Sequence, residues 1–154
     1  MAERLPYFHD IVNLDNNSFG FSPLLCATTN QEQPTDNQKS VIELLLENGA
    51  EMMLQSNDGM NALHWAVTVN NIPLLDFYIK RLGKEAPRLI NVKNLSGWTP
   101  IHIACVMNKM DSVNLLLSYG ADIHIKTPTG NSGIMEIVRC DHNDLLEILY
   151  KPYA

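Results

Sequence analysis

Two histidines occupy matching positions in similar stretches of the sequence, and they are the first residues to consider for chemistry. His64 lies in "NALHWA" and His102 lies in "TPIHIA". Imidazole is a common metal ligand, but zinc needs each ligating nitrogen at about 2.0–2.1 Å. If the two stretches are stacked helices, their axes lie about 8–10 Å apart, so equivalent side chains do not converge on one ion. We therefore expect structural histidines and neither a metal nor another cofactor.

The cysteines and acidic residues form no clearer catalytic group. Cys26 and Cys105 fall among apolar residues and are expected to be small buried side chains, while Cys140 has no evident neighbouring base. The sequence lacks a phosphate-binding loop, a zinc-protease motif and a nucleophile elbow. These observations predict that the protein is not an enzyme. A small enzyme that uses the histidines or Cys140 is the alternative.

Composition narrows the classes of partner. The 154 residues suffice for one domain with a core, and the net charge of −6 at pH 7 repels phosphate backbones and anionic lipid. No apolar stretch reaches the length of about 18 residues that a membrane span needs. We therefore expect no nucleic-acid partner and no membrane span. Three cysteines without paired spacing predict a reduced protein of the cytoplasm, or of the nucleus.

The stretches that hold the two histidines belong to a pattern that recurs along the chain. Four glycines lie at intervals of roughly 33 to 39 residues, and two positions after each comes a helix N-cap residue. The glycines and their cap residues are Gly20 with Ser22, Gly59 with Asn61, Gly97 with Thr99, and Gly130 with Ser132. Each glycine predicts a turn, and each cap predicts the start of a short helix.

A second apolar stretch at helical spacing follows in each unit. These stretches are residues 40–50, 73–79, 111–121 and 143–150. Their expected caps or first-turn residues are Ser40, Asn71, Asp111 and Asp141. Gly49 and Gly120 are expected to end their helices in the left-handed conformation, after which short extended stretches lead to the next glycine. Each unit is therefore expected to be a turn, two helices and an extended return.

This pattern resembles the ankyrin repeat. "TPIHIA" at 99–104, "NALHWA" at 61–66 and the helix end "YGAD" carry the resemblance. It implies an all-α solenoid of helix-turn-helix units with short β-hairpin-like return loops, in about four repeats plus an N-terminal partial repeat. The expected divisions are a partial or capping repeat at 1–19, repeats at 20–58, 59–96 and 97–129, and an atypical C-terminal repeat at 130–154.

Insertions and substitutions distinguish the units from one another. An insertion near 30–37 lengthens the first repeat and is expected to be a loop, and a second near 83–88 lengthens the next repeat. In the last repeat, Gly133, Met135 and Ile137 replace the proline, the histidine and the small alanine of the unit before it. These replacements are typical of a terminal repeat, whose outer face packs on nothing.

The resemblance also implies a binding face. In ankyrin repeats this face is concave and combines the tips of the return loops with the exposed side of the first helices. Carried over by register, the partner-binding residues are Phe19, Phe21, Met60, Val69, Leu95, Trp98, Val106 and Met107. Large apolar residues at turns are unusual and are typical of an interface. The alternative is that these side chains fold back onto their own loops.

The leading hypothesis for function is a monomeric, non-catalytic module for protein–protein interaction. More specifically, "ALHWAVTVNNIPLL" at 62–75 resembles repeats of the inhibitors of nuclear factor kappa B. The compact chain also resembles short ankyrin proteins of viruses and intracellular bacteria, which implies a mimic that sequesters a host regulatory factor. A regulatory or substrate-recruiting subunit of an enzyme complex is a further alternative.

Overall fold

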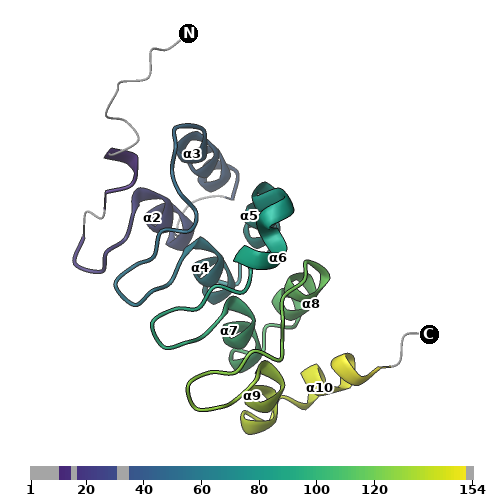
Figure 1. Ribbon diagram of the computed structural model, residues 1–154. Helices are drawn as coiled ribbons and strands as arrows, with labels where there is room; N and C mark the ends of the chain where they lie inside the picture. Colours follow the sequence, from purple (N-terminus) through teal and green to yellow (C-terminus); the bar gives the residue numbers. More distant parts are fainter. Residues whose placement is uncertain (1–10, 15–16, 31–34, 152–154) are drawn as a thin grey trace.

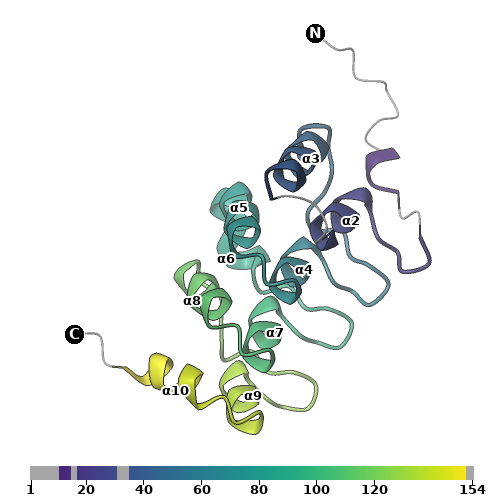
Figure 2. The ribbon, with the colours of Figure 1, turned by 180° about the vertical axis from the view of Figure 1, so that it is seen from behind.

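Helix pairs stack one after another in this computed structural model, which describes residues 11–14, 17–30 and 35–151. The first helices α2, α4, α7 and α9 form one row, and the second helices α3, α5 and α8 lie beside them (Figure 1). The return loops project on the side away from the second helices, as the view from behind also shows (Figure 2). No strand occurs in the described ranges, so the predicted all-α solenoid is confirmed.

The first helices begin where the sequence predicted. They are α2 (Pro23–Thr29), α4 (Ala62–Thr68), α7 (Pro100–Val106) and α9 (Gly133–Arg139). Ser22 and Ser132 accept a hydrogen bond from the first turn of α2 and α9, at 3.4 and 3.3 Å. Asn61 and Thr99 form capping boxes with the histidines three residues later. A side-chain acceptor thus satisfies an otherwise unpaired amide at each helix start.

The second helices begin within one residue of the predicted stretches except for α3, and their caps agree with the prediction only in part. They are α3 (Thr35–Glu47), α5 (Ile72–Leu82), α8 (Met110–Ser118) and α10 (Asn143–Tyr150). Asn71 caps α5 as expected, but Ser40 lies inside α3, where its hydroxyl donates to the Asp36 carbonyl at 2.9 Å. Asp141 does not cap α10 either, because it lies before the helix with a φ of 59°. Gly49 and Gly120 take the predicted left-handed conformation, with φ of 96° and 92°.

The insertions contribute helix as well as loop. Of the segment 30–37, residues 31–34 lie outside the described part, and residues 35–37 are helical, so α3 begins before the predicted residue 40. The segment 83–88 forms a 3-10 turn, Gly83–Glu85, that continues into α6, Ala86–Leu89, and Ala86 is buried. Of the predicted partial repeat at 1–19, residues 1–10 and 15–16 lie outside the described part, and Val12 is buried.

The core runs without interruption between the two rows of helices. Branched apolar residues at one position of the first helices, Leu24, Leu63 and Ile101, pack with Leu75, Tyr78, Ile79 and Leu116 of the second helices. Ala66 and Ala104, at the small-residue position of the first helices, are fully buried, and the matching Ala27 is half-buried. Cys105 is buried as predicted, and burial raises its pKa to about 12. Cys26 is exposed, contrary to the prediction, because its side of α2 faces away from the core.

The loop tips of successive units are hydrogen-bonded to one another. The Asn57 amide donates to the Phe19 carbonyl at 2.9 Å, and the Leu95 amide donates to the Asp58 carbonyl at 3.0 Å. The matching residue of the last tip is Pro128, which has no amide hydrogen to donate. These hydrogen bonds therefore join the tips of the first three units in a ladder, and Pro128 cannot extend it to the last unit.

Candidate protein-binding face

His64 and His102 connect each unit to the next one. The backbone amides of Asn61 and Thr99 donate to their Nδ1 atoms, at 3.2 and 3.1 Å. With Nδ1 accepting, Nε2 carries the proton and donates to the next return loop, from His64 to the Trp98 carbonyl at 3.0 Å and from His102 to the Ile125 carbonyl at 2.7 Å. Both nitrogens of each ring have protein partners, so the rings hold successive loops against the helix starts.

Burial keeps these two rings neutral. Desolvation lowers the pKa of His64 to about 4, and it also lowers the pKa of His102, although the hydrogen bonds to carbonyl oxygens act in the opposite direction. A neutral ring is what the hydrogen-bond pattern requires, since one nitrogen accepts and the other donates. Among the described residues, no group of three or more metal-ligating side chains converges.

The apolar residues predicted for the binding face fall into two groups. Phe19, Leu95 and Met107 are exposed, with 68%, 76% and 40% of their surface accessible. The half-buried group is Phe21, Met60, Val69, Trp98 and Val106. Of these, Phe21, Met60 and Trp98 pack against the core, so one side of each side chain is covered and the other is exposed to solvent. The predicted surface therefore combines exposed residues with residues that are packed on the core.

Aromatic contacts bring part of this face together. The Phe21 ring meets the Trp65 ring edge-on with centroids 5.1 Å apart, and the Phe19 ring lies 6.1 Å from that of Phe21. Trp65 was not among the predicted contact residues, although its register is that of Cys26 and Ile103 on the same side of the first helices. Its indole nitrogen is buried and has no hydrogen-bond partner within the described ranges.

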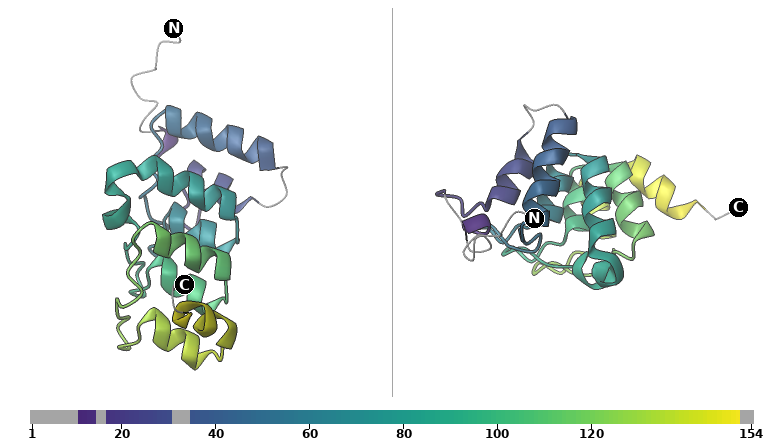
Figure 3. Two further views of the ribbon diagram at one scale, coloured as in Figure 1. Left: turned by 90° about the vertical axis from the view of Figure 1, so that its right-hand side faces the viewer. Right: turned by 90° about the horizontal axis from the view of Figure 1, so that it is seen from above.

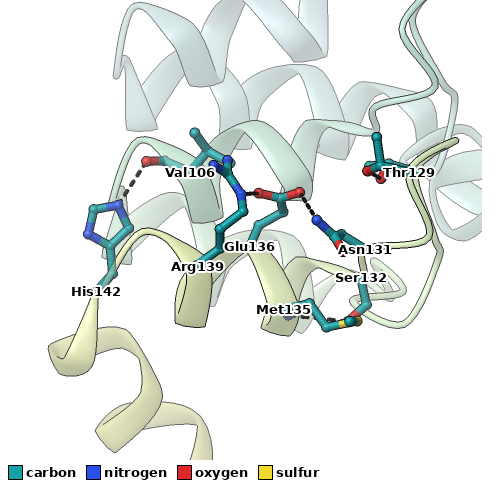
Figure 4. Close-up of polar contacts among 9 residues, drawn as sticks. Val106, Thr129, Asn131, Ser132, Met135, Glu136, Arg139 and His142 are labelled. Atoms are coloured by element: carbon teal, nitrogen blue, oxygen red, sulfur yellow. Dashed lines mark hydrogen bonds and ion pairs between the residues drawn. The ribbon is translucent and has the colours of Figure 1, made fainter.

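The C-terminal end of this face is polar. Glu136 is 2% exposed, and its carboxylate accepts from the Asn131 amide at 3.0 Å and from the Arg139 Nε at 2.7 Å (Figure 4). Burial opposes its charge, but these two hydrogen bonds and the Arg139 charge outweigh burial, so the pKa of Glu136 lies below its ordinary value. The sequence gives no signal for Glu136 as part of this face, because a lone glutamate in a helix is usually a surface residue.

A third histidine fixes the helix ends beside this pair. The His142 Nε2 donates to the Val106 carbonyl at 2.8 Å, which ties the start of α10 to the end of α7 (Figure 4). Met107 is the C-cap residue of α7, and Cys140 is the C-cap residue of α9. The ends of these two neighbouring helices are therefore held in one arrangement. In the part of the chain that the structure describes, no helix has the length and apolar character of a membrane span.

Comparisons with known proteins agree with this architecture. The family profile of ankyrin repeats, in three copies, matches residues 33–127. Human transient receptor potential cation channel subfamily A member 1 is 33% identical over 124 residues, covering 77% of this chain and 10% of that protein. The rat nuclear factor NF-kappa-B p105 subunit is 31% identical over 115 residues, covering 75% and 11%. A putative ankyrin repeat protein of fowlpox virus is 30% identical over 119 residues, covering 73% and 33%.

The chain thus spans between about a tenth and a third of the length of these relatives. What it shares with them is the repeat, and the match covers well over half of its residues. The same features recur in the structure: capped first helices, histidines that hold the next loop, and glycine turns joined in a ladder. On the basis of the profile match and these structural features, the chain belongs to the ankyrin-repeat family.

Proposed function

We propose that the protein is a non-catalytic module that binds another protein through the apolar residues of its loop tips and first helices. Ankyrin repeats are protein-interaction modules, so binding of a protein is the function that the family supports. The observation that carries the proposal is the exposure of Phe19, Leu95 and Met107 at 68%, 76% and 40%, together with the Phe19 ring lying 6.1 Å from that of half-buried Phe21. Exposed apolar groups that continue into anchored aromatic residues are typical of interfaces.

The architecture supports this choice of surface. Phe21 and Trp98 pack on one side against the core and lose little conformational freedom when a partner covers the other side. The ladder of hydrogen bonds holds Phe19, Asn57, Asp58 and Leu95 in a fixed order along the tips. A partner therefore meets a largely preorganised surface, which lowers the entropic cost of binding. We expect a monomeric protein of the cytoplasm or nucleus, and its free cysteines are consistent with a reducing compartment.

The test is a pair of matched double variants. Leu95→Asp with Met107→Asp places charges on the proposed face, and Val138→Asp with Tyr150→Asp places charges on comparably exposed residues of the last unit. Affinity capture from cell extract, with identification by mass spectrometry, should lose its partners with the first variant and keep them with the second. We expect at least a tenfold loss of affinity, about 1.4 kcal/mol. If both folded variants retain every partner at wild-type affinity, the proposed face is wrong.

A more specific candidate is sequestration of a regulatory factor. Identity of 31% to the NF-kappa-B p105 subunit, and of 30% to a fowlpox virus ankyrin repeat protein, favours an inhibitor-like protein or a pathogen-encoded mimic. Such a protein would cover its target with the same apolar face. Titration of purified nuclear factor kappa B subunits into the wild-type protein and the Leu95→Asp, Met107→Asp variant tests this candidate. Equal affinity for the two proteins, or the absence of binding, would remove it.

A further inference from the structure

We propose that the Arg139 guanidinium binds a carboxylate of the partner protein, beside an apolar partner residue that contacts Val106 and Met107. This inference rests on the proposed function and adds the chemistry of the partner. It concerns the C-terminal end of the binding face, where the first helices α7 and α9 end next to each other. The partner segment it describes pairs an apolar residue with a nearby aspartate or glutamate.

Comparison of equivalent positions shows that this end of the face differs from the rest. Glu136 stands in the register that holds Cys26, Trp65 and Ile103 in the preceding units. Arg139 stands in the register of Thr29, Thr68 and Val106. A row of uncharged residues is therefore replaced in the last unit by an acid and a base on the same side of α9. Both side chains extend from α9 toward α7 (Figure 4).

Glu136 positions Arg139, and its own carboxylate is not accessible to a partner. Its side chain is 3% exposed, and its two oxygens accept from Asn131 and Arg139. A buried carboxylate is costly unless it is paired and hydrogen-bonded, and here it has both kinds of support. Because its pKa is lowered, it stays charged at neutral pH. Glu136 therefore holds the Nε of Arg139 in a fixed position.

Arg139 retains binding capacity on its open side. Its side chain is 57% exposed, and only Nε is used in the bond to Glu136. Within the described ranges, the structure gives the two terminal nitrogens no acceptor. A guanidinium held at one edge presents its remaining donors as a planar fork, and that fork matches the two oxygens of a carboxylate. Anchoring by Glu136 also reduces the rotational freedom that binding would otherwise remove.

The residues around Arg139 favour a partner carboxylate that lies next to an apolar group. Met107 is 40% exposed and Val106 is half-buried, and His142 holds the end of α7 in place through the Val106 carbonyl at 2.8 Å. Asp141, the nearest acidic residue in sequence, accepts a hydrogen bond from Asn143 at 3.1 Å. The protein as a whole carries a charge of −6, so attraction of an acidic partner depends on this local arginine and not on the overall field.

The test uses a display library of random peptides selected on immobilised full-length protein. Peptides selected on the wild type should carry an aspartate or glutamate at a constant spacing from a large apolar residue. Selection on Arg139→Gln should keep the apolar preference and lose the acidic one. Arg88→Gln is the matched control, because Arg88 also pairs with a glutamate three residues earlier but lies in the insertion, at α6. It should select the same peptides as the wild type.

A selected peptide then allows a quantitative measurement. Replacing its acidic residue by the matching amide should weaken binding to the wild type about tenfold and leave binding to Arg139→Gln unchanged. If Arg139→Gln does not fold, as judged by circular dichroism, Arg139→Lys takes its place; it keeps the charge without the fork and should also weaken binding. Wild-type selection without an acidic preference, or an unchanged preference in the arginine variant, overturns this inference.

These outcomes separate the inference from the function on which it rests. Whether the acidic preference disappears in Arg139→Gln tests only the role of Arg139. The proposed binding face is wrong if Leu95→Asp with Met107→Asp selects the same peptides as the wild type. The proposed face is also wrong if the wild type selects no peptides. In that case the carboxylate proposal fails with it, because it assigns the apolar contact to the same surface.

Discussion

Gly59 and Gly130 hold the same place in their return loops, and both have a left-handed backbone, with φ of 79° and 84°. A Cβ atom on Gly59 would lie 2.4 Å from the backbone nitrogen of Leu95 in the next loop, whereas one on Gly130 would have no atom within 4 Å. The same glycine therefore has two functions in an internal unit, a turn and a close contact between loops. In the last unit only the turn remains.

The last unit differs in the same way at its helix. Val67 and Cys105 are fully buried by the following unit, but Val138 at the same register is 60% exposed. The position of the histidine holds Met135, which is 49% exposed. In addition, α10 does not follow the alignment of α3, α5 and α8 and points away from the stack (Figure 3). Two positions that are buried in internal units are thus exposed in the last one, at Val138 and Met135.

The largest effect that tests this comparison is expected from the glycines. Gly59→Ala should destabilise the protein by about 3 kcal/mol, because it combines left-handed strain with displacement of the Leu95 backbone. Gly130→Ala should cost only the strain, roughly 1–2 kcal/mol. Urea unfolding followed by circular dichroism measures both. Equal losses of stability would show that the contact between loops contributes nothing.

A smaller effect is expected from pH, and it arises in the units that carry the histidine. The unfolded chain protonates His64 near its ordinary pKa of 6.5, but the folded chain keeps the ring neutral down to about 4. Its stability contribution is therefore complete above pH 6.5 and falls as the pH drops toward 4, with about 2 kcal/mol lost at pH 5. His102 acts in the same direction.

The measurement is urea unfolding at pH 7 and pH 5, together with an NMR titration of the histidine rings. His64→Gln should remove most of the difference in stability between the two pH values, since its side chain does not titrate. A His64 ring that titrates near pH 6.5 in the folded protein would contradict the burial that the structure shows.

The smallest contrast concerns valines at one register. Val67→Ala removes two buried methyl groups and should cost about 2 kcal/mol, including the cavity that remains. Val138→Ala should change stability by less than about 0.5 kcal/mol, because its side chain is 60% exposed. Thermal unfolding resolves the pair. A similar loss in both variants would mean that another segment covers the end of the stack.

Much of the helical architecture was predictable because its signals are local. Ser22, Asn61, Thr99 and Ser132 were identified as caps from their type and their distance from a glycine, and all four lie at helix starts. The start of α3 and the helical insertion at α6 were not predicted, since a polar or proline-containing stretch is equally compatible with a loop. The boundaries between units stay a prediction, as do the roles of the eight residues assigned to the binding face.

The sequence by itself determined the repeat, its turns and the apolar side of each helix, because capping, left-handed glycines and helical periodicity act over a few residues. Only the tertiary structure decided which of these residues are exposed. Leu95 and Trp98 lie in one loop tip, yet Leu95 is 76% exposed and Trp98 packs against the core. Likewise, Glu136 is buried and Arg139 is exposed although both belong to α9. Burial depends on which neighbouring unit covers a side chain, and that contact lies about 33 or more residues away in sequence.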